Sequence, residues 1–171
     1  TCDGAFFKDK TVAVVGGGDV AVEDAIFLAR GCKKVYVIHR RDELRAAGVL
    51  QDALLARPKV ERVWDTVVDA IEGNEMVSSV KVTNKKTGAS DEIAVDGVFI
   101  AVGIVPVSAL ITGALETDEA GYIKAGEDGV TSMPGVFAAG DVRTKQLRQI
   151  ITAAADGANC VTSVEKYLIR H

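Results

Sequence analysis

The sequence predicts an α/β fold in which a parallel sheet precedes an antiparallel strand meander and part of a second domain. Three observations lead to this prediction. The apolar run TVAVV at 11–15 is followed by the glycine-rich GGGD and by helical spacing of apolar residues over 20–31. A second apolar run follows at 34–38. From 60 to 102, short β-branched segments replace the helical pattern, as expected for a meander.

The opening strand–helix–strand unit has a local reason for each element. The run at 11–15 is apolar and β-branched, which is typical of a strand buried on both faces. Gly31 suits the C-terminal cap of the helix that precedes the second strand at 34–38. Two strands joined through a helix run parallel in the same sheet.

The remaining elements are predicted by pattern and punctuation. A second helix over 43–56 ends before Pro58, because proline cannot continue a helix. In the meander, the NKKTGAS segment predicts a hairpin turn with Gly88 at its tip, and GVFIAVG at 97–103 is expected to return to the first sheet. A strand-like GVFAAGD and a final helix over about 146–169 follow.

Composition narrows the classes of protein that are possible. The chain has 171 residues, 48% of them hydrophobic, so a packed core is expected rather than disorder. A net charge of −4 argues against a nucleic-acid surface, and no apolar run approaches the roughly 18 residues of a membrane span. Three widely spaced cysteines favour a reducing cytoplasm, and no His or Cys spacing predicts a metal site. The N-terminus has neither a secretion signal nor an initiator Met, so we expect a piece of a longer protein.

A glycine motif between the first strand and helix predicts a dinucleotide site. Gly16, Gly18 and Ala21 form G-x-G-x-x-A, and Asp19 and Val20 complete the turn. The first glycine permits the tight turn, the second lets a pyrophosphate approach the backbone, and the alanine lets helix and strand pack closely. The helix N-terminus would then face the phosphates with free N–H groups. The alternative is an ordinary tight turn without a ligand.

Arginines at the end of the second strand predict which dinucleotide binds. An acidic residue there would bind the ribose 2′-OH of NAD and repel a 2′-phosphate, whereas guanidinium groups match that phosphate. Arg40 and Arg41 stand at this strand end, and Arg45 follows about one helical turn later. The pattern therefore favours NADP(H). The alternative is a solvated basic turn paired with Asp42 and Glu43.

His39 is a further candidate cofactor residue, because it directly precedes these arginines. It is expected either to stack near the adenine or to end the strand structurally.

Several motifs in a fixed order resemble one family. TCDG, VAVVGGGDVAVEDA, VIHRRDELRA, DGVFIAVGIVP, TSMPGVFAAGDV and LRQIITAAADGANC together resemble the low-molecular-weight thioredoxin reductases. The resemblance implies a Rossmann-like NADPH domain of the flavoprotein type with two dinucleotide-binding domains. It assigns 1–108 to that domain and 109–171 to the C-terminal segment of the FAD domain, with the N-terminal FAD-binding half absent.

The resemblance also assigns roles to individual residues. Cys2 would be the flavin-proximal cysteine of a Cys-x-x-Cys-Asp motif whose other cysteine lies before Thr1, and Asp3 would be the acid that manages the proton. Read alone, Cys2 would be an inert thiol. Gly103 would lie where backbone approaches NADPH, or would only end a strand.

Near the C-terminus the resemblance implies contacts with FAD. Asp141 would bind the ribityl or pyrophosphate region, and Gly140 would give backbone clearance. The flavin edge would contact Arg148, Gln149 and Ile150. Without the resemblance, this segment reads as a strand and turn.

The implied activity is electron transfer from NADPH through FAD and a cysteine pair to thioredoxin or a thioredoxin-like disulfide protein. We expect a homodimer. We also expect a chain of this length to be inactive by itself. The alternatives are the flavoprotein partner of a peroxidase and a non-catalytic NADP-binding module. Relatives that use ferredoxin are disfavoured, because they lack the arginines.

Overall fold

The computed structural model of the chain describes residues 2–111 and 113–170. It divides into two compact units, Thr1–Gly103 and Ile104–His171, called here the first and second units. The assignment of 1–108 and 109–171 to two cofactor domains stays a prediction. The first unit contains η1 (Cys2–Phe7), β1 (Thr11–Val15), α1 (Asp19–Leu28), β2 (Lys34–Ile38), α2 (Gly48–Leu55), β3 (Val60–Val63), β4 (Thr66–Gly73), β5 (Val77–Asn84), β6 (Ser90–Ala94) and β7 (Gly97–Ile100).

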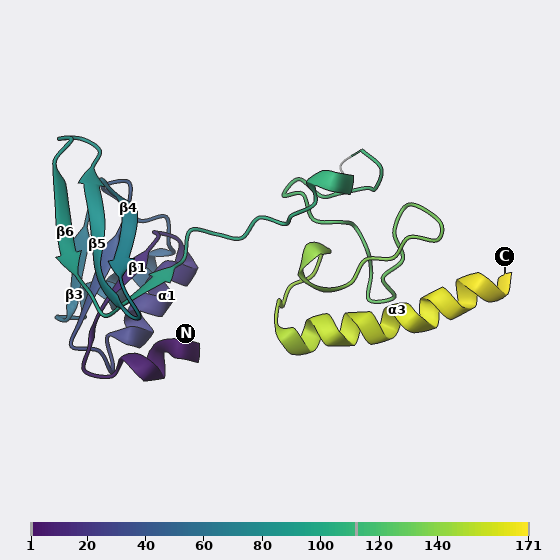
Figure 1. Ribbon diagram of the computed structural model, residues 1–171, viewed down its shortest axis with the longest axis horizontal. Helices are drawn as coiled ribbons and strands as arrows, with labels where there is room; N and C mark the ends of the chain where they lie inside the picture. Colours follow the sequence, from purple (N-terminus) through teal and green to yellow (C-terminus); the bar gives the residue numbers. More distant parts are fainter. Residues whose placement is uncertain (1, 112, 171) are drawn as a thin grey trace. The chain divides into compact units, whose positions relative to one another are not determined.

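The first unit has three layers (Figure 1). Helices α1 and α2 cover one face of a parallel sheet of order β3-β2-β1-β7, and an antiparallel sheet of order β4-β5-β6 covers the other. Because side chains alternate along a strand, Val12 and Val14 of β1 join the core beneath the helices, whereas Ala13 joins the core beneath the meander. The predicted α/β fold class is confirmed.

Most strand predictions of the first unit are confirmed, but the meander begins at β4 rather than at residue 60, because β3 pairs in parallel with β2 and belongs to the first sheet. β1 and β2 occupy 11–15 and 34–38, and they pair in parallel with Thr11 opposite Lys34. β7 returns to the first sheet and pairs in parallel with β1, with Val12 opposite Gly97. A Cβ at Gly97 would overlap the Phe7 ring, so η1 packs closely onto this strand.

Helix α2 is shorter than predicted, because it begins at Gly48 rather than at 43. Tertiary hydrogen bonds hold the preceding residues out of helical conformation. The backbone N–H of Arg45 donates to the Gly17 carbonyl at 2.7 Å, and that of Ala47 donates to an Asp19 carboxylate oxygen at 2.8 Å. These contacts join the arginine segment to the glycine turn.

The second unit is built around one long helix. It contains η2 (Ala109–Ile111), η3 (Gly140–Val142) and α3 (Ile150–Arg170), and Figure 1 shows the irregular loops that run alongside α3. The predicted strand at GVFAAGD is wrong, because Phe137 forms only an isolated bridge with Val130. A small apolar cluster that includes Leu115 and Ile123 forms its core.

Candidate dinucleotide site

The glycine turn between β1 and α1 is built by close contacts. Gly16 is buried at φ 152° and donates its N–H to the Ile38 carbonyl at 3.1 Å. A Cβ there would overlap the Ala101 carbonyl and lie 2.8 Å from the Ala21 methyl group. This position therefore requires glycine, and Ala21 packs against it as predicted for a small residue.

The N-terminus of α1 is open to a ligand. Gly18 is the N-cap, no side chain caps this helix end, and a Cβ at Gly18 would meet nothing within 4 Å. Val20 is 62% exposed. Asp19 directs its carboxylate to Ala47, so only the backbone N–H of Asp19 is left for a cofactor. Free first-turn N–H groups and the positive helix end suit a pyrophosphate.

His39 is buried beneath the glycine turn. It is 5% exposed, and a Cβ on Gly17 would overlap its imidazole ring. Its Nε2 is buried without a hydrogen-bond partner. Burial, and then the charge of Arg45 and of the two arginines that follow His39, lowers the pKa of this imidazole, so it is neutral at neutral pH. His39 therefore packs against the glycine turn and supports it.

Three exposed guanidinium groups follow β2. We call Arg40, Arg41 and Arg45 the arginine trio. Within the residues that the structure describes, none of the three forms an ion pair, because the nearby Asp42 pairs with Lys86 at 2.7 Å instead. The alternative that Asp42 neutralises these arginines is therefore not what the structure shows, and the trio is available to an anion.

A cleft of about 530 Å³ lies beside this turn. It runs along the carboxyl ends of β1, β2 and β7, which is where open α/β sheets bind ligands. Gly103, at φ 108°, follows the cleft residue Val102. The cleft is lined by Val15, Gly16, Gly17, Ile38, His39, Arg40, Arg45, Thr66, Val67, Val68, Asp69, Ala70, Ile71, Ile100, Ala101 and Val102.

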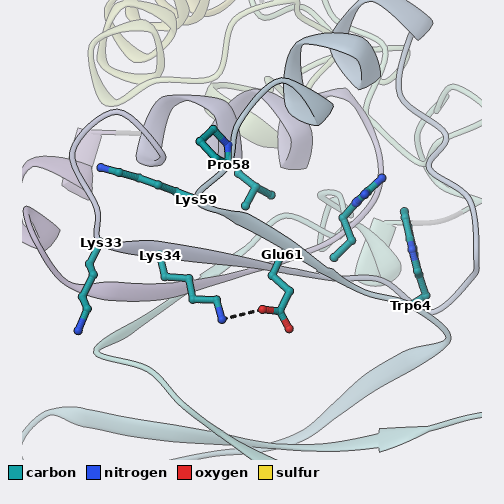
Figure 2. Close-up of a pocket in the computed structure, with 8 residues that line it drawn as sticks. Lys33, Lys34, Pro58, Lys59, Glu61 and Trp64 are labelled. Atoms are coloured by element: carbon teal, nitrogen blue, oxygen red, sulfur yellow. Dashed lines mark ion pairs between the residues drawn. The ribbon is translucent and has the colours of Figure 1, made fainter.

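A second, more basic pocket of about 630 Å³ lies along the edge strand β3 (Figure 2). Three of its four cations already have partners, and the fourth is Lys33. Lys34 Nζ pairs with Glu61 at 2.6 Å, and Lys59 Nζ donates to the Cys32 carbonyl at 2.9 Å. Arg62 stands over the Trp64 ring, 5.9 Å from its centroid. Since its lining includes neither a glycine nor the first turn of a helix, the cleft beside β1 is the better cofactor candidate.

The predicted flavin residues gather around the N-terminus of α3 in the second unit. Gly140 has φ 80° in η3, and Asp141 beside it is exposed. Arg148 donates from Nε to the Asp141 carbonyl at 3.3 Å, and its guanidinium lies 3.9 Å from the Tyr122 ring centroid. Gln149 and Ile150 are exposed at the start of α3. The structure therefore brings these five predicted residues together.

The sequence reading missed a buried ionic cluster that holds this loop. Asp156 of α3 is 5% exposed and accepts hydrogen bonds from Gly140 N–H at 2.9 Å, Arg143 Nη2 at 2.5 Å and Lys145 Nζ at 2.8 Å. The hydrogen bond from Arg143, and then those from Lys145 and Gly140, hold the pKa of Asp156 far below its usual range. The only signal in the sequence was a charged residue within the apolar spacing of the last helix.

The predicted redox residues lie in η1. Asp3 is exposed, whereas the Cys2 side chain lies outside the described residues. η1 packs on α1, since a Cβ at Gly4 would touch Phe27. Across residues 2–111 and 113–170, no group of three or more His, Cys, Asp or Glu side chains could hold a metal ion. None of the helices in those same ranges is long and apolar enough to span a membrane.

Comparisons with known proteins identify the family of this chain. The model of the family described as pyridine nucleotide-disulphide oxidoreductase matches residues 2–157. The thioredoxin reductase of Peptoclostridium litorale is 45% identical, over 98% of this chain and 55% of its own length. That of Listeria innocua is 47% identical, over 98% of this chain and 53% of its own length.

Solved structures give the same result. The thioredoxin reductase of Streptococcus pyogenes is 50% identical with a TM-score of 0.85, over 99% of this chain and 56% of that one. That of Lactococcus lactis is 42% identical with a TM-score of 0.69, over 99% and 56%. The resemblance predicted from the motifs is confirmed, and the peroxidase-partner and non-catalytic alternatives are not favoured. The chain spans about half the length of the relatives it matches.

Proposed function

Because this chain belongs to the pyridine nucleotide-disulphide oxidoreductase family, we propose that it supplies the NADPH site and one edge of the flavin site of a thioredoxin reductase. In such an enzyme, bound FAD would supply the redox chemistry that links NADPH to a cysteine pair. The final acceptor is the disulfide of thioredoxin or a thioredoxin-like protein.

One observation supports NADPH most directly: among the residues that the structure describes, the arginine trio has no ion-pair partner, and it follows a strand that ends at the open glycine turn. The residues present fit this cofactor. Gly18 leaves space for the pyrophosphate, and the N–H groups at the start of α1 would hold it. The trio would hold the 2′-phosphate, for which NADH has no counterpart.

The second unit offers a fitting edge for FAD. Gly140 is buried at φ 80° and carries no side chain beside Asp141, whose exposed carboxylate would bind a ribityl hydroxyl. Arg148 and Gln149 would lie at the isoalloxazine edge, and the positive N-terminus of α3 would stabilise a reduced, anionic ring.

The roles of Cys2 and Asp3 are part of the same proposal. Asp3 is exposed and free to exchange protons with a neighbouring thiol. A reducing cytoplasm is the proposed compartment, in keeping with the free thiols of Cys32 and Cys160. A homodimer is proposed because α3 carries largely exposed apolar side chains such as Leu168, which is 67% exposed.

Calorimetric titration of the chain with NADPH and NADH tests the cofactor proposal. We expect NADPH to bind at least about tenfold more tightly, because the trio would form charge-assisted hydrogen bonds to the extra phosphate. Replacing each arginine of the trio by Ala should weaken NADPH binding and leave NADH binding unchanged.

Arg30→Ala is the matched control, because Arg30 is exposed and follows the opposite end of α1. It should leave both affinities unchanged. Equal binding of NADPH and NADH by the unmodified chain would contradict the proposal. Flavin content and disulfide reduction, assayed on a protein that spans the full length of the relatives, test the flavin and thioredoxin roles separately.

A further inference from the structure

We propose that Lys86 sets the preference of this site for NADPH over NADH, by holding the Asp42 carboxylate away from the arginine trio. The inference rests on the proposed function, since it concerns how the 2′-phosphate is recognised. Lys86 belongs to the β5–β6 hairpin, 44 residues beyond Asp42 in the chain.

Lys86 lies between two acidic side chains. Its Nζ is 2.7 Å from Asp42 Oδ2 and 3.0 Å from Asp65 Oδ2. The hydrogen bond from Lys86 lowers the pKa of Asp42, and both carboxylates raise the pKa of Lys86. Asp42 directly follows Arg41 in the chain, so without Lys86 its carboxylate would be an unpaired negative charge in the segment that carries the trio.

The hairpin tip is built to deliver this lysine. Asn84 Oδ1 accepts the backbone N–H groups of Lys86 and Thr87 at 3.0 Å each, which fixes the turn. The N–H of Lys85 donates to the Asp65 carbonyl at 2.6 Å, and the N–H of Asp65 donates to the Arg41 carbonyl at 3.1 Å. A chain of backbone bonds therefore ties the hairpin to the arginine segment.

Asp65 shows that the arrangement carries a local cost. Its φ is 54°, a left-handed conformation that is uncommon for a residue other than glycine, and its side chain is only 17% exposed. The turn at Asp65 is held by its bonds to Arg41 and Lys85. Such strain persists only where the surrounding contacts stabilise it.

The consequence for specificity is electrostatic. A carboxylate and a phosphate compete for the same guanidinium fork, and a carboxylate beside the fork also repels a 2′-phosphate. With Asp42 held by Lys86, the Asp42 carboxylate does not compete with the 2′-phosphate for the guanidinium groups of the trio. NADH has no phosphate at this position, so its binding should not depend on Lys86.

Lys86→Met tests this inference in the chain as it exists. We expect the Kd for NADPH to rise about two- to fivefold, which is the size of one exposed ion pair, while the Kd for NADH stays constant. The effect should fade at about 1 M salt, where the Debye length is about 3 Å. Lys86→Arg, which keeps the pairing, should retain the ratio of the two Kd values.

A double variant distinguishes withdrawal of Asp42 from direct binding of the phosphate by Lys86. Adding Asp42→Asn to Lys86→Met should restore NADPH affinity, because the competing charge is gone. Lys81→Met is the matched control, since Lys81 is an exposed lysine of the same sheet that pairs with Glu72 at 2.7 Å. It should leave the Kd ratio unchanged.

Four results would overturn the inference. An unchanged ratio in Lys86→Met, with NADPH still preferred by the unmodified chain, would overturn it while leaving the proposed function intact. Failure of Asp42→Asn to restore affinity would assign Lys86 to the phosphate itself. Equal weakening of NADPH and NADH would show a purely structural role. Absence of any preference in the unmodified chain would instead overturn the proposed function and this inference with it.

Discussion

Asp19 accepts the backbone N–H of Ala47 at 2.8 Å, and this bond joins the first turn of α1 to the segment that carries Arg45. A second bond, from the N–H of Arg45 to the Gly17 carbonyl at 2.7 Å, lies beside it. Hydrogen bonds thus join the glycine turn to the segment that carries Arg45 of the arginine trio. We therefore expect binding of the pyrophosphate and binding of the 2′-phosphate to be coupled.

Removal of the Asp19 carboxylate tests this coupling. In Asp19→Ala, the segment before α2 loses one of its two anchors, so we expect NADPH affinity to fall about three- to tenfold, or about 1 kcal/mol. Asp19→Asn keeps an acceptor oxygen and should stay within about twofold of the unmodified chain. Calorimetric titration measures both. Equal affinity for Asp19→Ala and the unmodified chain would show that the anchor is dispensable.

Gly17 and Gly18 are adjacent but should respond differently to alanine. A Cβ at Gly17 would overlap the His39 ring, so we expect Gly17→Ala to lower the free energy of unfolding of the first unit by about 1–3 kcal/mol. A Cβ at Gly18 meets nothing within 4 Å, so Gly18→Ala should leave stability within about 0.5 kcal/mol. It should instead weaken NADPH binding, because the methyl group would stand where the pyrophosphate approaches.

Urea unfolding followed by the fluorescence of Trp64, the single tryptophan, measures the first unit. Adding His39→Ala to Gly17→Ala should recover part of the loss, since it removes the overlapping ring. Equal stability of Gly17→Ala and Gly18→Ala would contradict the close packing of His39 against the turn.

Much of the first unit was predictable, because its signals are local. The apolar runs at 11–15 and 34–38 and the glycine turn depend on residues next to one another in the chain. The start of α2 was not predictable, because its preceding segment is held by Asp19 and Gly17, which lie far earlier in the sequence. Lys86 lies 44 residues beyond Asp42, so the sequence alternative paired Asp42 with the neighbouring arginines instead of with this lysine.

The pKa of His39 predicts a pH dependence of stability. Burial lowers this pKa below 6.5, so the folded first unit binds the proton less readily than the unfolded chain does. The stability that neutral His39 contributes is present above the unfolded pKa, and it is lost as the pH falls through 6.5 toward the folded pKa. We therefore expect the urea midpoint of the first unit to fall between about pH 7 and pH 5.

His39→Gln should flatten this slope, because glutamine does not titrate. Carboxylates contribute little in this range, since most titrate near about pH 4. His171 is present in both proteins, so its contribution cancels in the comparison. The same slope in His39→Gln and in the unmodified chain would assign the pH dependence to another group.

Asp156 should be the most sensitive charged position of the second unit. Its carboxylate is buried with Arg143 and Lys145, so Asp156→Ala would leave two cations without their partner. Breaking one side of a buried ionic cluster costs about 3–5 kcal/mol. We expect α3 to melt at a lower temperature, which circular dichroism at a helical wavelength measures, while the Trp64 fluorescence transition of the first unit stays unchanged.

Glu165→Ala, an exposed change on the same helix, is the control and should shift stability by less than about 0.5 kcal/mol. Similar melting of the Asp156→Ala and Glu165→Ala variants would show that the cluster does not hold the loop at Gly140.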